Sequence, residues 1–206
     1  RWALHGLVNE PSIVIVNDGS WSHESVTIFE NLSKITGIFV LNLAKNVGKG
    51  AAIKLGLEYI QNEDISYIVT ADADGQHSVD DIYKVLTTSI LREKFVIGVR
   101  ELSSFTVPLK SLVGNICSRI IFFLTTGRSL KDTQSGLRAF SKRSLPKMLQ
   151  VSGSRYEYEM AVLMHFFNNK FENTVDVSTA YFDKNKGSFF RPFKDSILVY
   201  SVFFNY

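Results

Sequence analysis

The stretch YIVTADADGQH, residues 67–77, decides the fold that this sequence predicts. Its first four residues, Tyr67 to Thr70, are β-branched or aromatic and predict a buried strand, which Asp72 and Asp74 follow at once. Similar runs, each ended by polar residues, occur at Ser12 to Val16, Ile38 to Leu43 and Phe95 to Val99. Because segments with helical periodicity lie between these runs, the sequence predicts an α/β fold with a mostly parallel sheet flanked by helices.

Composition narrows the class of protein. The chain has 206 residues, of which 45% are hydrophobic and 21% charged, as expected for one globular domain spanning residues 1–206. A net charge of +3 is too small to predict a nucleic-acid partner. The single cysteine, Cys117, excludes an internal disulfide framework and favours a reducing, cytoplasmic location. No uncharged apolar run reaches the roughly 18 residues of a spanning helix.

The carboxylates that follow the third strand predict a metal site. Asp72 and Asp74 are two residues apart where the strand ends, so both side chains can face one hard cation, and Gln76 can add a carbonyl oxygen. A divalent metal held there would bridge the oxygens of a diphosphate and neutralise charge on a leaving group. The alternative is a solvated turn, since Asp and Gly are common turn residues.

Two further clusters precede this motif. Asp18 lies in NDGS at the end of the first strand, where it can accept hydrogen bonds from a base or ribose, although an Asp-Gly turn explains it equally well. Lys49 lies in NVGKG, which lacks the spacing of a P-loop. We interpret that segment as a glycine-assisted turn into a helix, with Lys49 available to a nucleotide or its phosphates.

A fourth cluster, DTQSGLRAF, begins at Asp132 and follows the apolar segment Ile116 to Thr126. Gly136 permits tight backbone geometry, and the planar guanidinium of Arg138 suits a phosphate. Asp132 can orient or deprotonate an acceptor. The alternative is a polar loop with a structural Asp-Arg pair.

Taken in this order, the clusters resemble the family 2 glycosyltransferases, in particular the dolichyl-phosphate-mannose-synthase-like and bacterial polyprenyl-phosphate sugar transferases. The resemblance runs from about Ser12 to about Tyr200, through VNDGS, NVGKGAA, TADADGQH, IGVR, DTQSGLRAF, RYEYEM and GSFFRPFKDS. It implies a GT-A fold, an inverting displacement at the anomeric carbon of the sugar, and Mg²⁺ or Mn²⁺ as cofactor.

The resemblance also implies roles for individual residues. The metal would be held by Asp72, Asp74 and Gln76. The catalytic residues would be Asp132, beside the acceptor, and Arg138, on a phosphate. The substrates would be bound by Asp18 at the nucleoside, Arg100 at a phosphate, and Lys49, Gln134 and Glu159.

One feature departs from the family pattern. Members usually begin with a strand that ends in a Pro-x-Tyr-Asn-like turn and helps to cradle the nucleotide, and no such strand precedes Ser12. We therefore expect the usual first strand to be missing, which would leave a sheet edge or a gap beside the base pocket.

The end of the chain predicts a contact with a membrane surface. From about residue 182 to 206, cations alternate with aromatic residues, a mixture that suits the interface of an anionic bilayer. The alternative is an aromatic core with solvated cations. Altogether we expect an inverting transfer of sugar from a UDP- or GDP-sugar to a polyprenyl phosphate, by an enzyme peripheral to the cytoplasmic membrane face. Transfer to a saccharide or protein hydroxyl, or an inactive nucleotide-binding domain, are the alternatives.

Overall fold

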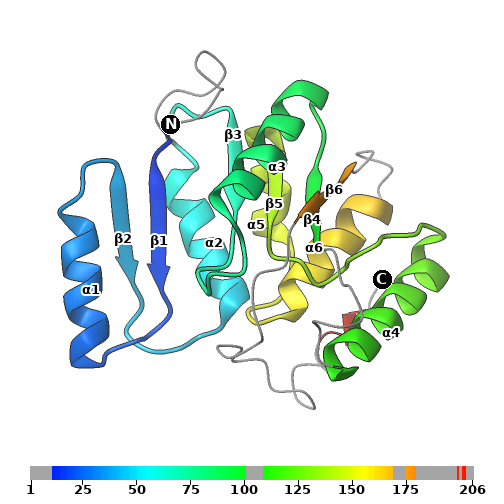
Figure 1. Cartoon of the computed structure of the whole chain (residues 1–206), viewed down its shortest axis with the longest axis horizontal. Helices are drawn as coiled ribbons and strands as arrows, with labels where there is room; N and C mark the ends of the chain where they lie inside the picture. The colour runs from blue at the N-terminus through cyan, green and yellow to red at the C-terminus, as the bar shows by residue number, and fades with distance from the viewer. Residues whose placement is uncertain (1–10, 101–108, 169–174, 180–198, 200, 203–206) are drawn as a thin grey trace.

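The computed structural model describes residues 11–100, 109–168, 175–179, 199, 201 and 202. Strands and helices alternate along most of this part (Figure 1). The strands are β1 (Ile13–Asn17), β2 (Ile38–Asn42), β3 (Tyr67–Thr70), β4 (Val96–Arg100), β5 (Arg138–Ser141) and β6 (Val175–Thr179). The helices are α1 (His23–Ser33), α2 (Lys49–Ile60), α3 (Val79–Arg92), α4 (Leu109–Thr126), α5 (Leu145–Gln150) and α6 (Glu157–Asn168), with a 3-10 turn η1 (Lys142–Ser144) before α5.

The described strands form two sheets. β1 and β2 pair in parallel, and a second sheet has the order β3-β5-β4-β6. β4 and β6 are parallel, but β5 runs antiparallel to both of its neighbours. The expectation of an α/β fold is confirmed. Two strands were not predicted: β5, which was interpreted only as the end of a polar cluster, and β6. In the described residues no strand pairs with the second edge of β1, and residues 1–10 lie outside them.

The antiparallel direction of β5 positions the site. Its first residue, Arg138, pairs with Thr70 at the end of β3 and with Ile97 in β4. The start of β5 therefore lies at the same edge of the sheet as the end of β3, where Asp72 and Asp74 follow. A parallel β5 would have carried Arg138 to the opposite edge.

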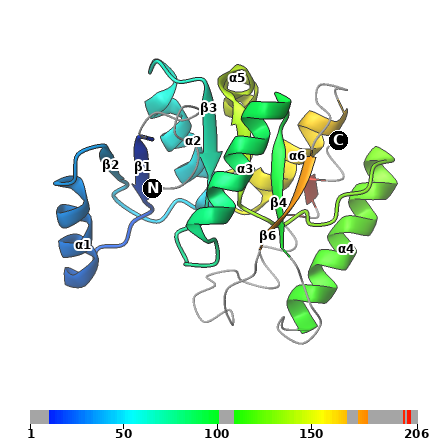
Figure 2. The same cartoon turned by 45° about the horizontal axis from the view of Figure 1, so that its top comes forward.

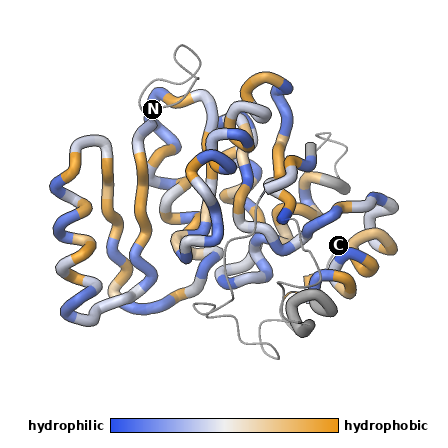
Figure 3. Tube along the Cα trace, viewed as in Figure 1, coloured by the Kyte–Doolittle hydropathy of each residue, from blue (hydrophilic) through white to orange (hydrophobic). Residues whose placement is uncertain are grey.

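The strands of the larger sheet bury both of their faces. Side chains alternate between the two faces of a strand, and Ile68 and Ile97 lie in one hydrophobic cluster while Tyr67, Val69 and Val96 lie in another. α3 packs on the second cluster, and α6 contributes to the first. Figure 3 shows the hydrophobic residues along these strands. Because both faces are covered, the polar groups of this sheet gather at its edges.

Side-chain caps explain where two of the helices begin. Ser22 accepts a hydrogen bond from the backbone of Ser25 at the start of α1, and Ser78 accepts one from Asp81 at the start of α3. Each satisfies a backbone N–H that has no partner within its helix. α1 and α4 lie at opposite ends of the molecule in both views (Figures 1 and 2).

Most of the segment from 182 to 206 lies outside the described residues, so its membrane contact stays a prediction. Val199 and Val202 are described, and both are buried in the first cluster. These two side chains pack inside the protein, whereas residues 182–206 were expected to contact a membrane. Within the part of the chain that the structure describes, no helix is long and apolar enough to span a bilayer.

Candidate active site

The turn before α2 is held by Asp18. Its Oδ1 accepts a hydrogen bond from the backbone N of Val47 (2.8 Å) and its Oδ2 one from that of Gly48 (3.0 Å). Gly48 has a φ of +112°, and a Cβ there would lie 2.6 Å from the carbonyl oxygen of Ser154, so only glycine fits. Asp18 thus fixes the loop that presents Lys49. Its predicted contact with a nucleoside stays a prediction.

Lys49 joins two carboxylates that are distant in sequence. Its Nζ lies 2.7 Å from Oδ1 of Asp72 and 2.8 Å from Oε2 of Glu159. Burial alone would lower the pKa of Lys49, but the charges of Glu159 and Asp72 outweigh it and raise that pKa above its usual value. Burial likewise opposes the charge of Asp72, yet the ammonium of Lys49 holds the pKa of this carboxyl below its usual range. Lys49 and Asp72 are therefore both charged at neutral pH.

The carboxylate of Asp72 lies against the backbone of the fourth sequence cluster. A Cβ at Gly136 would lie 2.5 Å from Oδ2 of Asp72, so the glycine leaves the room that the carboxylate occupies. Thr70 donates a hydrogen bond from its Oγ1 to the carbonyl oxygen of Gly136 (3.1 Å), which ties the two segments together. A side chain at position 136 would displace Asp72.

Arg138 is buried behind this pair. Its Nε donates to the carbonyl oxygen of Ser135 (3.0 Å) and its Nη1 to that of Glu159 (2.7 Å). Its Nη2 is buried with no hydrogen-bond partner in the part of the chain described. Burial lowers the pKa of Arg138, against the charges of Glu159, Asp72 and Asp132. A buried donor without a partner is costly, so this nitrogen is suited to a further acceptor.

A second ion pair involves Asp132. Arg100, the last residue of β4, donates from Nε to Oδ2 of Asp132 (2.7 Å) and from Nη2 to Oδ1 (3.0 Å). The backbone N of Gln134 donates to the same Oδ1 (2.9 Å). The Asp132 side chain has no exposed surface. Three hydrogen bonds to one buried carboxylate fix its position and occupy both of its oxygens.

The predicted metal ligands differ in exposure. Asp74 is exposed, and its Oδ1 accepts a hydrogen bond from the backbone N of Gln76 (3.1 Å), while Asp72 is half-buried and paired with Lys49. The described residues contain no group of three or more His, Cys, Asp or Glu side chains placed to hold a metal ion. Two carboxylates and an amide oxygen nevertheless match the oxygen ligands of Mg²⁺ and Mn²⁺. The metal role of Asp72, Asp74 and Gln76 stays a prediction.

His77 is a residue whose setting the sequence analysis missed. Two carboxylates and two cations lie close enough to act on His77 electrostatically: Asp72, Asp74, Arg100 and Lys49. Its Nδ1 is buried without a hydrogen-bond partner among the described residues. Burial lowers the pKa of His77, so its imidazole is neutral at pH 7. The available signal was its place directly after DADGQ, but no role for His77 was predicted from the sequence.

The structure thus connects some of the predicted residues and separates others. Lys49, Asp72, Glu159 and Arg138 form one contiguous polar cluster, which we call the Lys49 cluster. Arg100 and Asp132 form a separate pair, whose charges still influence His77 and Arg138. Gln134 is exposed, and its Nε2 lies 3.5 Å from Oγ of Ser118 in α4.

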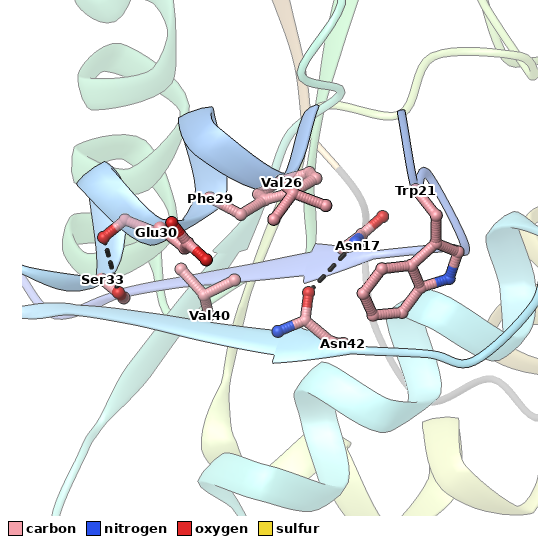
Figure 4. Close-up of a pocket in the computed structure, with 8 residues that line it drawn as sticks. All are labelled: Asn17, Trp21, Val26, Phe29, Glu30, Ser33, Val40 and Asn42. Atoms are coloured by element: carbon pink, nitrogen blue, oxygen red, sulfur yellow. Dashed lines mark hydrogen bonds between the residues drawn. The ribbon is translucent and has the colours of Figure 1, made fainter. Parts of the chain in front are cut away.

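A small cavity lies away from this cluster, between α1 and the β1-β2 sheet (Figure 4). Its volume is about 200 Å³. It is lined by Asn17, Trp21, Val26, Phe29, Glu30, Ser33, Val40 and Asn42. Asn17 donates to Oδ1 of Asn42 (3.0 Å) and accepts from the backbone N of Ser20 (2.7 Å), so the polar groups at its end are already paired. We interpret it as a packing gap under α1.

Known structures with the same fold include enzymes crystallised with a metal and a nucleotide. Glucosyl-3-phosphoglycerate synthase from Mycobacterium tuberculosis superposes on 93% of this chain, and on 68% of its own, with a TM-score of 0.64 and 16% identity. The same enzyme in complex with Mn²⁺, UDP and glucosyl-3-phosphoglycerate gives a TM-score of 0.62. At this identity the likeness shows the fold, which is of the GT-A type.

Sequence relatives give the family. A UDP-N-acetylglucosamine–dolichyl-phosphate N-acetylglucosaminyltransferase from Methanococcus voltae is 33% identical over 84% of this chain and 76% of its own length. A polyprenol monophosphomannose synthase from Mycolicibacterium smegmatis is 24% identical over 89% of this chain and 71% of its own. The model of glycosyl transferase family 2 matches residues 3–149. With more than half of its length matched, this chain belongs to glycosyl transferase family 2.

Proposed function

We propose that this glycosyltransferase moves a sugar from a UDP- or GDP-sugar to a polyprenyl phosphate, with inversion at the anomeric carbon, at the inner face of the membrane. The observation that carries the proposal is the Lys49 cluster, which gathers residues of four distant motifs at one sheet edge. The relatives support the acceptor class, since the M. voltae enzyme is named for dolichyl phosphate and the M. smegmatis enzyme for a polyprenol.

Asp72, Asp74 and Gln76 would hold Mg²⁺ or Mn²⁺. When bound, the metal would neutralise charge on the departing nucleoside diphosphate. In the structure, the ammonium of Lys49 pairs with Oδ1 of Asp72, and it would have to leave this oxygen for the metal to bind there. The ammonium of Lys49 would then stay paired with the carboxylate of Glu159. Lys49 would then be placed to contact a donor phosphate. The vacant donor of Arg138, at Nη2, would be satisfied by a phosphate oxygen.

The acceptor explains the state of Asp132. A polyprenyl phosphate is already ionised at neutral pH, so its oxygen needs no general base. Asp132, with three hydrogen-bond donors on it, would position Arg100 toward the acceptor and would take no proton. A saccharide or protein hydroxyl would require Asp132 as a base, which its bidentate pairing with Arg100 disfavours.

The test is a transfer assay with purified protein, a panel of UDP- and GDP-sugars and a polyprenyl phosphate in mixed micelles, with Mn²⁺, Mg²⁺ or EDTA. We expect a sugar–phosphate–polyprenol product that forms only with a divalent metal and whose anomeric configuration is inverted relative to the donor. Product on a saccharide or peptide acceptor alone would refute the acceptor class. Nucleotide binding without turnover on any acceptor would indicate an inactive domain.

A further inference from the structure

Along residues 115–126 of α4, the outer surface is apolar, although it faces away from the core. Four large hydrophobic side chains on this helix are between 42 and 76% exposed, and we call them the α4 stripe: Ile116, Ile120, Phe123 and Leu124. Their spacing of three or four residues places them on one side of the helix. A helix on the surface of a water-soluble domain normally shows the opposite pattern, with polar residues outward.

Three polar residues in the described part of α4 make contacts on its inner side. Asn115 and Ser118 are buried, and they lie 3.5 Å from Oγ1 of Thr133 and from Nε2 of Gln134 respectively. Arg119 donates from Nε to the carbonyl oxygen of Leu130 (2.9 Å). The inner side of α4 therefore contacts the loop that carries Asp132, the residue proposed to position Arg100 toward the acceptor.

The position of α4 leaves this stripe accessible. Among the described elements, α4 lies at the end of the molecule farthest from α1 (Figures 1 and 2). Figure 3 shows hydrophobic residues recurring along its described part. The loop after α4 also carries an exposed cation, Lys131. Apolar side chains beside cations suit the boundary between acyl chains and anionic headgroups.

We infer that the α4 stripe rests in the headgroup region of the bilayer that carries the acceptor. This inference depends on the proposed function for its choice of partner, because a polyprenyl phosphate keeps its chain in the bilayer and its phosphate at the surface. A stripe embedded there would bring the loop of residues 130–134 to the level of the phosphate. The outer side of α4 would then contact the membrane, while its inner side holds the loop of residues 130–134 at the acceptor site.

The experiment compares two matched double variants of the full chain. Ile120→Gln with Leu124→Gln removes half of the stripe, and Ile28→Gln with Leu91→Gln replaces similarly exposed residues on α1 and α3. Binding is measured by flotation with vesicles of phosphatidylcholine and phosphatidylglycerol. We expect the stripe variant to bind roughly tenfold or more weakly than the parent, and the control to bind like the parent.

Transfer assays separate this inference from the proposed function. Transfer to a long polyprenyl phosphate in vesicles should fall with binding, whereas transfer to a short, water-soluble isoprenyl phosphate should stay at the parental rate. Absence of transfer by the parent, with vesicle binding still lost in the stripe variant, would refute the proposed function alone. Equal flotation of both variants, no flotation of the parent, or a parental dimer that the stripe variant dissociates in light scattering would overturn the inference.

Discussion

Asp72 and Asp132 both pair with a cation near a strand end, but they are held differently. Asp72 shares the single ammonium of Lys49 with Glu159, and 29% of its side chain is exposed. Asp132 accepts two parallel hydrogen bonds from Arg100, and none of its side chain is exposed. An ammonium is a point charge that exchanges partners easily, whereas a planar guanidinium fixes geometry. We therefore expect Asp72 to exchange its cation for a metal, and Asp132 to act as a positioning residue.

The largest effect is expected at the exposed end of the metal site. Asp74→Asn removes one hard ligand and should reduce turnover by roughly 10²- to 10³-fold, the size of loss seen when one preorganised electrostatic contact is removed. Its thermal midpoint should match the parent's, because Asp74 is exposed. Asp80→Asn, at an exposed site in the first turn of α3, is the control. Full turnover of Asp74→Asn at saturating Mn²⁺ would remove this residue from the site.

Arg138 tests whether the buried part of the site tolerates a point charge. Arg138→Lys keeps the charge but cannot donate to Ser135 and Glu159 together, so we expect unfolding to become easier by about 1–3 kcal/mol. Transfer should fall at least about tenfold under conditions where the variant is folded, because the vacant nitrogen is lost. Arg143→Lys, at an exposed position in the turn η1, is the control for urea unfolding and kinetics. Activity within twofold of the parent would leave Arg138 a purely structural role.

Asp132→Asn sharpens the distinction between base and positioning residue. It weakens the hold on Arg100, so we expect the KM for polyprenyl phosphate to rise about tenfold with little change in kcat, since such charge-assisted pairs contribute roughly 1.5–3 kcal/mol. The shape of the pH profile should stay the same, because no proton is taken from an ionised acceptor. A fall in kcat of several orders of magnitude, with loss of the basic limb of the profile, would make Asp132 a general base.

The smallest effects concern Lys49, which competes with a metal for Asp72. Lys49→Met should strengthen Mn²⁺ binding about fivefold in the absence of donor, and Glu159→Gln should weaken it similarly by leaving Asp72 as the sole partner of Lys49. Electron paramagnetic resonance of free Mn²⁺ measures both. Lys54→Met on the same helix is the control, since Lys54 lies over the ring of Tyr158. Changes of the same sign in both variants would show a general loss of structure.

Local patterns predicted much of this fold. The strand at Tyr67–Thr70 and the helix that follows the glycines near Lys49 lie where the periodicity places them. β5 was missed because only four residues follow a long polar run, too few for alternation to be visible. The pairing of Lys49 with Asp72 and Glu159 needs tertiary contact between three segments, which periodicity does not contain. His77 was missed because burial, not sequence, makes its ring nitrogen unusual.

The most direct test of the comparison is a Mn²⁺ titration of the parent, Asp72→Asn and Asp132→Asn, followed by electron paramagnetic resonance in the presence of UDP. We expect Asp72→Asn to bind Mn²⁺ at least about tenfold more weakly than the parent, since a neutral amide replaces a charged ligand. Asp132→Asn should bind it with the parental affinity. Parental binding in Asp72→Asn, or a loss in Asp132→Asn alone, would contradict the assignment of the metal to Asp72.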